Sequence, residues 1–140
     1  MERQRMKDGI DMVLDVREMI NVPSFKSLID GEVYGNIRPD GSIKADVVVT
    51  AIGINDDQDQ DGAGNIRIYV PKIKQNGVMV TDQTRLWELG KAIVDLMDDK
   101  FKNTFRVWID SRPKLNKDSD GSYHLHMGYQ YHSIRENSSI

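Results

Sequence analysis

Two runs of β-branched and aromatic residues dominate the middle of the chain and predict a pair of strands. The runs are Val47–Ile54 and Asn65–Val70, and Gly, Asp and Asn residues lie on either side of them. Such runs are typical of paired strands. In the second run, one parity carries apolar residues that we expect to face a core: Ile66, Ile68 and Val70. The other parity carries Arg67 and Tyr69, which we expect to face solvent or a partner.

Apolar positions elsewhere predict two helices and two later strands. Met6–Ile20 and Asp82–Lys100 each place apolar residues at spacings of three, four and seven, which is the pattern of an amphipathic helix. Phe105–Ile109 and Tyr123–Tyr131 alternate with a period of two and read as strands. A short segment around Val33 is a further candidate strand.

The order of these elements predicts an α+β fold. Hairpin-like connections favour antiparallel pairing, and two amphipathic helices can cover one face of a sheet. We therefore expect a mainly antiparallel sheet of four to five strands with two main helices packed on one face. Residues 1–140 are expected to form a single domain, with a core over about 6–133 and a loose tail at 134–140.

Composition excludes several classes of function. The chain has 140 residues, a net charge of −3 and no cysteine, so disulfides, thiolate nucleophiles and Cys-ligated metals are excluded. Basic residues are spread out, which argues against sequence-specific or non-specific nucleic-acid binding. No apolar run approaches the roughly 20 residues of a membrane span, and the charged N-terminal segment does not resemble a signal peptide. These features predict a protein that is made in a cytosol and does not enter a membrane.

An acidic loop over residues 56–65 is the one candidate for a metal site. Asp57, Asp59 and Asp61, followed by Gly62, match the opening of a calcium-binding loop. However, Ile68 occupies the twelfth position, where such a loop needs a bidentate Glu, and the flanks read as strands. A solvated hairpin loop is the favoured interpretation. A weak divalent-cation site in a small cytosolic binding module is the alternative.

No catalytic motif stands out, so we expect a protein that is not an enzyme and that uses no cofactor. His124 and His126 share one side of the last predicted strand, as two metal ligands could. His132 has the same parity but lies about 20 Å from His126 at ~3.3 Å per residue, which is too far to share an ion. A polar strand face explains these histidines better, and an enzyme that uses His124 and His126 is the weaker alternative.

Aromatic and basic residues alternate on the outward side of two predicted strands. Arg67 and Tyr69 form one such set, and Arg106 and Trp108 form the other. Aromatic residues beside Arg are enriched at protein–protein contacts. These four residues are therefore the candidate assembly interface, provided that both strands belong to one sheet.

The layout resembles the small tail-completion or tail-terminator proteins of long-tailed phages and prophages, the head–tail joining group. The likeness runs from the helix Met6–Ile20 through Val33–Gly35 and the strands Asp46–Ile54 and Asn65–Pro71 to a helix that opens near Thr81–Leu86, with two late strands after it. It covers about residues 6–133 as an order of elements and a hydrophobic pattern, without a sharp signature.

The resemblance implies a structural virion-assembly protein with a mechanical role. Proteins of this group form a ring of identical subunits that ends or completes the tail tube and joins it to the head. The implied partners are further copies of the chain and other tail or head-joint proteins. The implied location is the cytoplasm of the bacterial host during assembly, and then the virion tail. No catalytic residues carry over.

Overall fold

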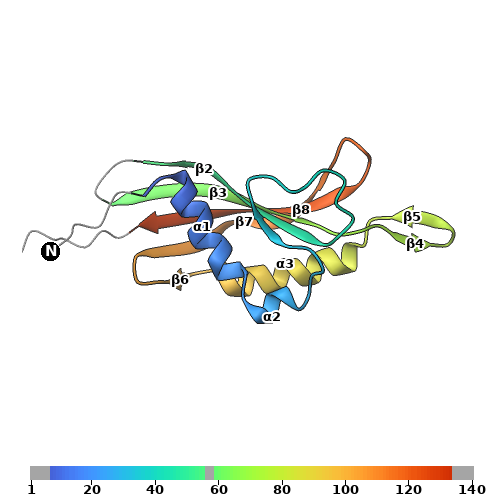
Figure 1. Cartoon of the computed structure of the whole chain (residues 1–140), viewed down its shortest axis with the longest axis horizontal. Coiled ribbons are helices and arrows are strands. Elements are labelled where there is room, and N and C mark those ends of the chain that lie inside the picture. The colour runs from blue at the N-terminus through green and yellow to red at the C-terminus, as the bar shows by residue number, and fades with distance from the viewer. Residues whose placement is uncertain (1–6, 56–58, 134–140) are drawn as a thin grey trace, which may run out of the picture.

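The computed structural model describes residues 7–55 and 59–133, which form a curled mixed sheet, a separate hairpin and three helices (Figure 1). The strand order of the large sheet is β1-β2-β3-β8-β7-β6, and β4 pairs with β5 in the small sheet. The strands are β1 Val33–Gly35, β2 Asp46–Ile54, β3 Gln60–Tyr69, β4 Ile73–Gln75, β5 Val78–Val80, β6 Lys100–Phe101, β7 Phe105–Lys117 and β8 Tyr123–Ser133. The helices are α1 Gly9–Ile20, α2 Pro23–Lys26 and α3 Gln83–Met97.

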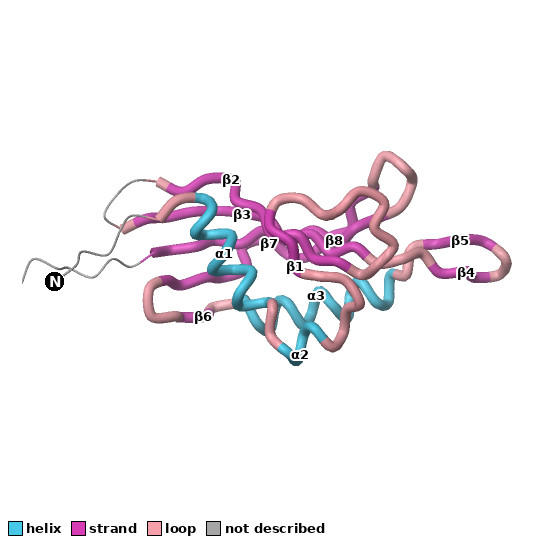
Figure 2. Tube along the Cα trace, in the orientation of Figure 1, coloured by secondary structure: helices cyan, strands magenta, loops and turns pink. Residues whose placement is uncertain are grey.

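The predicted antiparallel sheet of four to five strands was wrong. In the described residues the large sheet has six strands, and β1 runs parallel to β2, with Tyr34 opposite Val48. The connection between them runs away from the sheet and returns to the start of β2, so the two strands point the same way (Figure 2). The extra strands have only two or three residues each, which is too short to show an alternating pattern.

The strand β3 begins at Gln60, five residues before the predicted run. The added segment contains Gly62 and Gly64, which weaken any strand signal in the sequence. Close packing leaves no room for a side chain at either glycine. A Cβ at Gly62 would lie 2.5 Å from the sulfur of Met12, and a Cβ at Gly64 would lie 2.1 Å from the carbonyl oxygen of Thr50. Much of the predicted acidic loop is therefore part of the sheet.

The helix α1 starts at Gly9 because Asp8 caps it. The Asp8 side chain accepts a hydrogen bond from the backbone N–H of Asp11, and the Asp11 side chain accepts one from the backbone N–H of Asp8, at 2.9 and 3.0 Å. This reciprocal pair is a capping box. At the other end, Asn21 is the C-cap shortly before Pro23.

The helix α3 ends at Met97, three residues earlier than predicted. Its N-cap is Asp82, which accepts from the backbone N–H of Arg85 at 3.2 Å. At the C-terminal end, Asp98 leaves the helix and its carboxylate accepts from the backbone N–H of Ile109 at 3.0 Å. Carboxylates are unfavourable at a helix C-terminus, so the chain turns to the sheet edge there.

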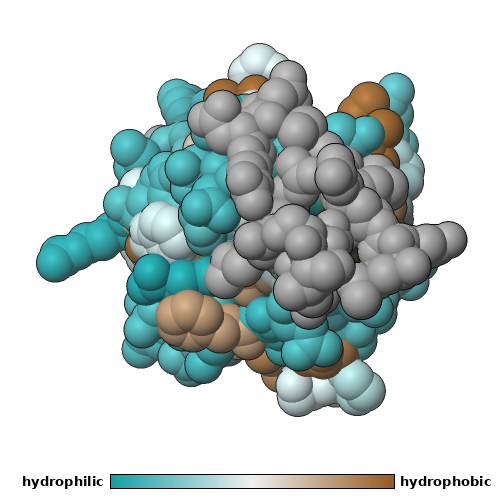
Figure 3. Space-filling view, turned by 90° about the vertical axis from the view of Figure 1, so that its left-hand side faces the viewer, coloured by the Kyte–Doolittle hydropathy of each residue, from teal (hydrophilic) through white to brown (hydrophobic). Residues whose placement is uncertain are grey.

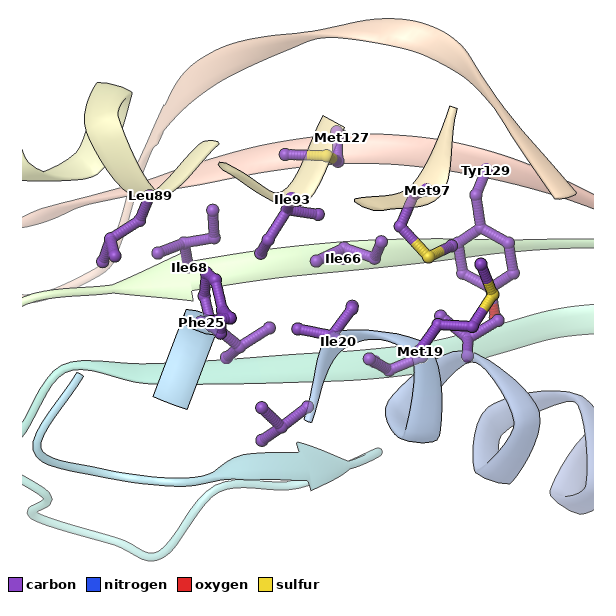
Figure 4. Close-up of a cluster of buried hydrophobic side chains, with 14 of the residues drawn as sticks. Met19, Ile20, Phe25, Ile66, Ile68, Leu89, Ile93, Met97, Met127 and Tyr129 are labelled. Atoms are coloured by element: carbon purple, nitrogen blue, oxygen red, sulfur yellow. The ribbon is translucent and has the colours of Figure 1, made fainter. Parts of the chain in front are cut away.

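The hydrophobic core lies between one face of the large sheet and the helices α1 and α3 (Figure 4). Each element contributes the apolar positions of its own period. Labelled examples are Met19 and Ile20 from α1, Leu89, Ile93 and Met97 from α3, Ile66 and Ile68 from β3, and Met127 and Tyr129 from β8.

Two buried tyrosines of the core donate hydrogen bonds to polar groups at its edge. The hydroxyl of Tyr129 donates to the carbonyl oxygen of Thr50 at 2.9 Å, and that of Tyr131 donates to the Asp15 carboxylate at 2.5 Å. Lys7 reaches both Tyr131 and Asp15, each at 2.8 Å. Burial raises the pKa of both tyrosine hydroxyls, so they remain protonated donors.

A hairpin of β4 and β5 projects from one end of the molecule (Figure 1). Its turn is Asn76–Gly77, with φ values of 52° and 80°. Two successive positive φ values fit a type I′ turn, which matches the twist of a two-stranded ribbon and favours Asn-Gly. The two strands on either side of this turn were not among the elements predicted from the sequence.

Candidate contact surface

The face of the sheet opposite the helices carries the candidate interface residues. Arg67 on β3 lies opposite His126 on β8, which lies opposite Lys114 on β7. Further along β8, Arg106 lies opposite His132. Phe105 and Val107, the neighbours of Arg106, are buried in the core, so Arg106 is on the outward side. Both predicted sets therefore belong to one sheet and one face.

The first set is partly covered by the connection between β1 and β2. The Arg38 guanidinium lies 4.3 Å from the centre of the Tyr69 ring, and Asp46 holds that guanidinium at 3.1 Å. The ring of His124 lies 5.2 Å from the Tyr69 ring. Tyr69 is consequently half-buried, and Arg67 is half-buried as well.

The second set forms a stacked cluster beside the sheet edge. The Arg106 guanidinium lies 4.9 Å from the Phe101 ring centre and 4.8 Å from that of Trp108. Its Nη2 donates to the Asp99 carboxylate at 2.8 Å. Phe101 remains 66% exposed, so the cluster presents an aromatic surface to solvent.

The two sets do not make one patch. Arg67 is opposite His126, and Arg106 is opposite His132, six residues further along β8. At ~3.3 Å per residue this is about 20 Å. The sequence predicted the shared face, whereas the register separates its candidate residues into two groups.

The three histidines of this face differ in their hydrogen bonds. His124 Nδ1 lies 2.9 Å from an Asp118 carboxylate oxygen, and His132 Nδ1 lies 2.7 Å from one of Asp61. His126 Nδ1 is buried and has no hydrogen-bond partner among the described residues. The ring centres of His124 and His126, the two residues of the weaker metal-ligand alternative, lie 6.5 Å apart.

Among the described residues, no group of three His, Asp or Glu side chains is placed to hold a metal ion. Of the candidate ligands, Asp57 lies outside the described residues, and Asp59 is exposed. Asp61 belongs to β3 and contacts His132.

The pKa of His126 is expected to lie below the ordinary value of about 6.5 for histidine. Burial lowers the pKa of His126, and the charges of His124, Lys114 and Arg67 lower it further. His126 binds a proton more readily in the unfolded chain than in the folded one. The free energy of unfolding therefore decreases as the pH falls below about 6.5. NMR titration should show this low pKa, and Lys114→Ala should raise it. A pKa at or above 6.5 in the wild type contradicts the expectation.

A groove on the helical side of the sheet was not indicated by the sequence. It has a volume of about 1050 Å³ and lies between the C-terminal halves of α1 and α3 and the segment from β6 to the start of β7. Figure 3 looks at the end of the molecule that lies on the left of Figure 1, and its lower part shows apolar side chains in brown among hydrophilic ones in teal. Phe101 belongs both to this groove and to the Arg106 cluster. A two-residue strand gives no periodic signal that could have located it.

Within the described chain, no helix combines the length and the apolar character needed to cross a membrane. Neither a scan against protein-family models nor a search of curated proteins found a match to this chain.

Proposed function

We propose that this protein is a structural subunit of a phage or prophage tail. Copies of the chain form a ring that ends or completes the tail tube and joins it to the head. The action is mechanical, without catalysis or a cofactor. Assembly takes place in the cytoplasm of a bacterial host, and the ring then belongs to the virion tail. The order of elements along the chain, given by the resemblance above, supports the tail assignment.

The observation that carries the proposal is the exposure of large apolar side chains at both ends of the molecule. Val78 and Met79 in the projecting hairpin are 61% and 57% exposed, and Phe101 in β6 is 66% exposed. A subunit in a ring uses two different surfaces, one toward each neighbour. Apolar side chains that a single chain leaves in water are typical of such contacts.

The outward face of the sheet supplies polar groups for contacts with other tail or head-joint proteins. Arg67 and Lys114 flank His126 without an ion pair among the described residues. The Arg106 cluster offers a guanidinium between two aromatic rings. Arg and aromatic residues often dominate binding energy at interfaces, so these two areas are the candidate surfaces for a different partner.

The proposal predicts that the purified protein forms a closed oligomer. Light scattering over a concentration series should give a single mass that is a whole multiple of 16.0 kDa and stops rising once the ring closes. Electron microscopy should show annular particles. A monomer at the highest attainable concentration, or an open series of ever larger species, contradicts ring formation.

A second experiment tests the tail role. The ring is added to polymerising tail tubes of the same phage and should limit their length; no effect on length contradicts the tail role.

A further inference from the structure

The β4–β5 hairpin exposes more apolar surface than an isolated ribbon can keep stable. Each strand has three residues, and Ile73, Val78 and Met79 are 40%, 61% and 57% exposed. A two-stranded hairpin is at best marginally stable in water unless another layer packs on it. The hairpin therefore needs a covering surface that its own subunit does not provide.

The two sides of this hairpin differ in charge. Ile73 pairs with Val80, and Gln75 pairs with Val78, so one side is apolar and uncharged. Lys74 pairs with Met79, so the other side combines an apolar residue with a positive charge. A binding site for this hairpin needs one apolar wall and one wall that is apolar and acidic.

The groove beside β6 has one wall that is apolar and acidic and one wall of aromatic rings flanked by positive charges. The helical wall carries Met19 and Leu96 together with the carboxylates of Glu18 and Asp95. Glu18 and Asp95 are exposed and form no ion pair within the described residues. The opposite wall carries the rings of Phe101 and Phe105, with Lys100 and Lys102 beside them.

The hairpin and the groove lie toward opposite ends of the molecule (Figure 1), so a subunit cannot fill its own groove with its own hairpin. A second copy can. Such a contact is head-to-tail, and every subunit then gives one hairpin and receives one.

We propose that the β4–β5 hairpin of one subunit docks into the groove between α1, α3 and β6 of the next subunit. The side with Lys74 and Met79 faces the helical wall, where the ammonium group meets Glu18 and Asp95. The uncharged side with Ile73 and Val78 faces Phe101 and Phe105, which keeps Lys74 away from Lys100 and Lys102. This contact rests on the proposed function, because it assumes that copies of the chain assemble with one another.

The test uses two variants that each remove one half of the contact. In the hairpin variant, a short Gly-Ser linker replaces residues 73–80. In the groove variant, Asp95→Lys and Phe101→Glu change the groove at two exposed positions. Each variant alone should be a monomer, whereas an equal mixture should form a one-to-one dimer, because one intact hairpin and one intact groove remain. Light scattering measures both results, and unchanged melting temperatures confirm that the variants fold.

Cysteine cross-linking supplies an independent measurement, because the chain has no cysteine of its own. Oxidation of a Met79→Cys, Leu96→Cys double variant should give a ladder of linked chains. A matched control pairs Met79→Cys with Ile52→Cys, which is 71% exposed, lies outside the groove and does not share a hollow with Met79, and should give no ladder.

The outcomes separate this contact from the proposed function. A hairpin variant that still forms the wild-type ring overturns the hairpin contact and leaves the ring standing. A mixture that stays monomeric also overturns it. A wild-type protein that is monomeric at all concentrations overturns both proposals.

Discussion

Replacing Gly64 with alanine is expected to lower the free energy of unfolding by about 3 kcal/mol, at the upper end of the cost of overpacking a core. A Cβ at this position would lie 2.1 Å from the Thr50 carbonyl oxygen and 2.4 Å from the Tyr129 hydroxyl. Those two groups are hydrogen-bonded to each other at 2.9 Å. One is backbone in the neighbouring strand and the other ends a fully buried ring, so neither can move away freely. Urea unfolding followed by circular dichroism measures the loss.

Gly53→Ala is the matched control for Gly64→Ala. Gly53 is in β2, close to Gly64 in the sheet, but it is exposed and a Cβ there would meet nothing within 4 Å. Alanine also restricts the unfolded chain more than glycine does, so this variant should be neutral or slightly more stable. Equal losses in both variants would show that strand propensity, and not the contact with Tyr129, determines the effect.

Asp46→Ala is expected to cost about 3 kcal/mol, close to the lower end for removing one partner of a buried ion pair. Its fully buried carboxylate accepts from the Ser42 hydroxyl at 2.5 Å and from the backbone N–H of Glu32 at 3.2 Å. It also pairs with Arg38 at 3.1 Å. The connection between β1 and β2 is held on the sheet by these bonds. A fall in melting temperature of about 10 °C is expected, which scanning calorimetry can measure.

The control for Asp46→Ala is Asp40→Ala in the same connection. Asp40 is exposed, so its removal should change stability by less than about 0.5 kcal/mol. Asp46 pairs with the Arg38 guanidinium, which lies 4.3 Å from the centre of the Tyr69 ring and also donates to the Ser42 carbonyl oxygen at 2.8 Å. If Asp46→Ala unfolds no more easily than Asp40→Ala, the buried carboxylate does not anchor this connection.

The candidate surface could be predicted in part. Alternation placed Arg67 and Tyr69 on one side of their strand, and Arg106 and Trp108 on one side of theirs. The register then decided the distance between them, and Arg38 from a distant connection covers Tyr69. Neither the strand register nor the contact of Arg38 with Tyr69 can be predicted from periodicity, because both depend on residues far apart in the chain. The same holds for the groove, whose walls come from three separate segments.

The sequence by itself determined the inward faces of β3, β8 and α3, because burial on one face produces a period of two in a strand and spacings of three and four in a helix. In α1 the same spacing selected Ile10 and Leu14, which are 66% and 50% exposed, whereas Met12, Val16 and Met19 are buried. Tertiary structure alone decided the parallel pairing of β1, the short strand β6 and the early start of β3. Pairing partners for short or glycine-containing strands are selected by packing against Met12, Tyr129 and Asp46, and such contacts leave no periodic signal. The exposed hairpin and the groove at opposite ends of the molecule follow from that packing.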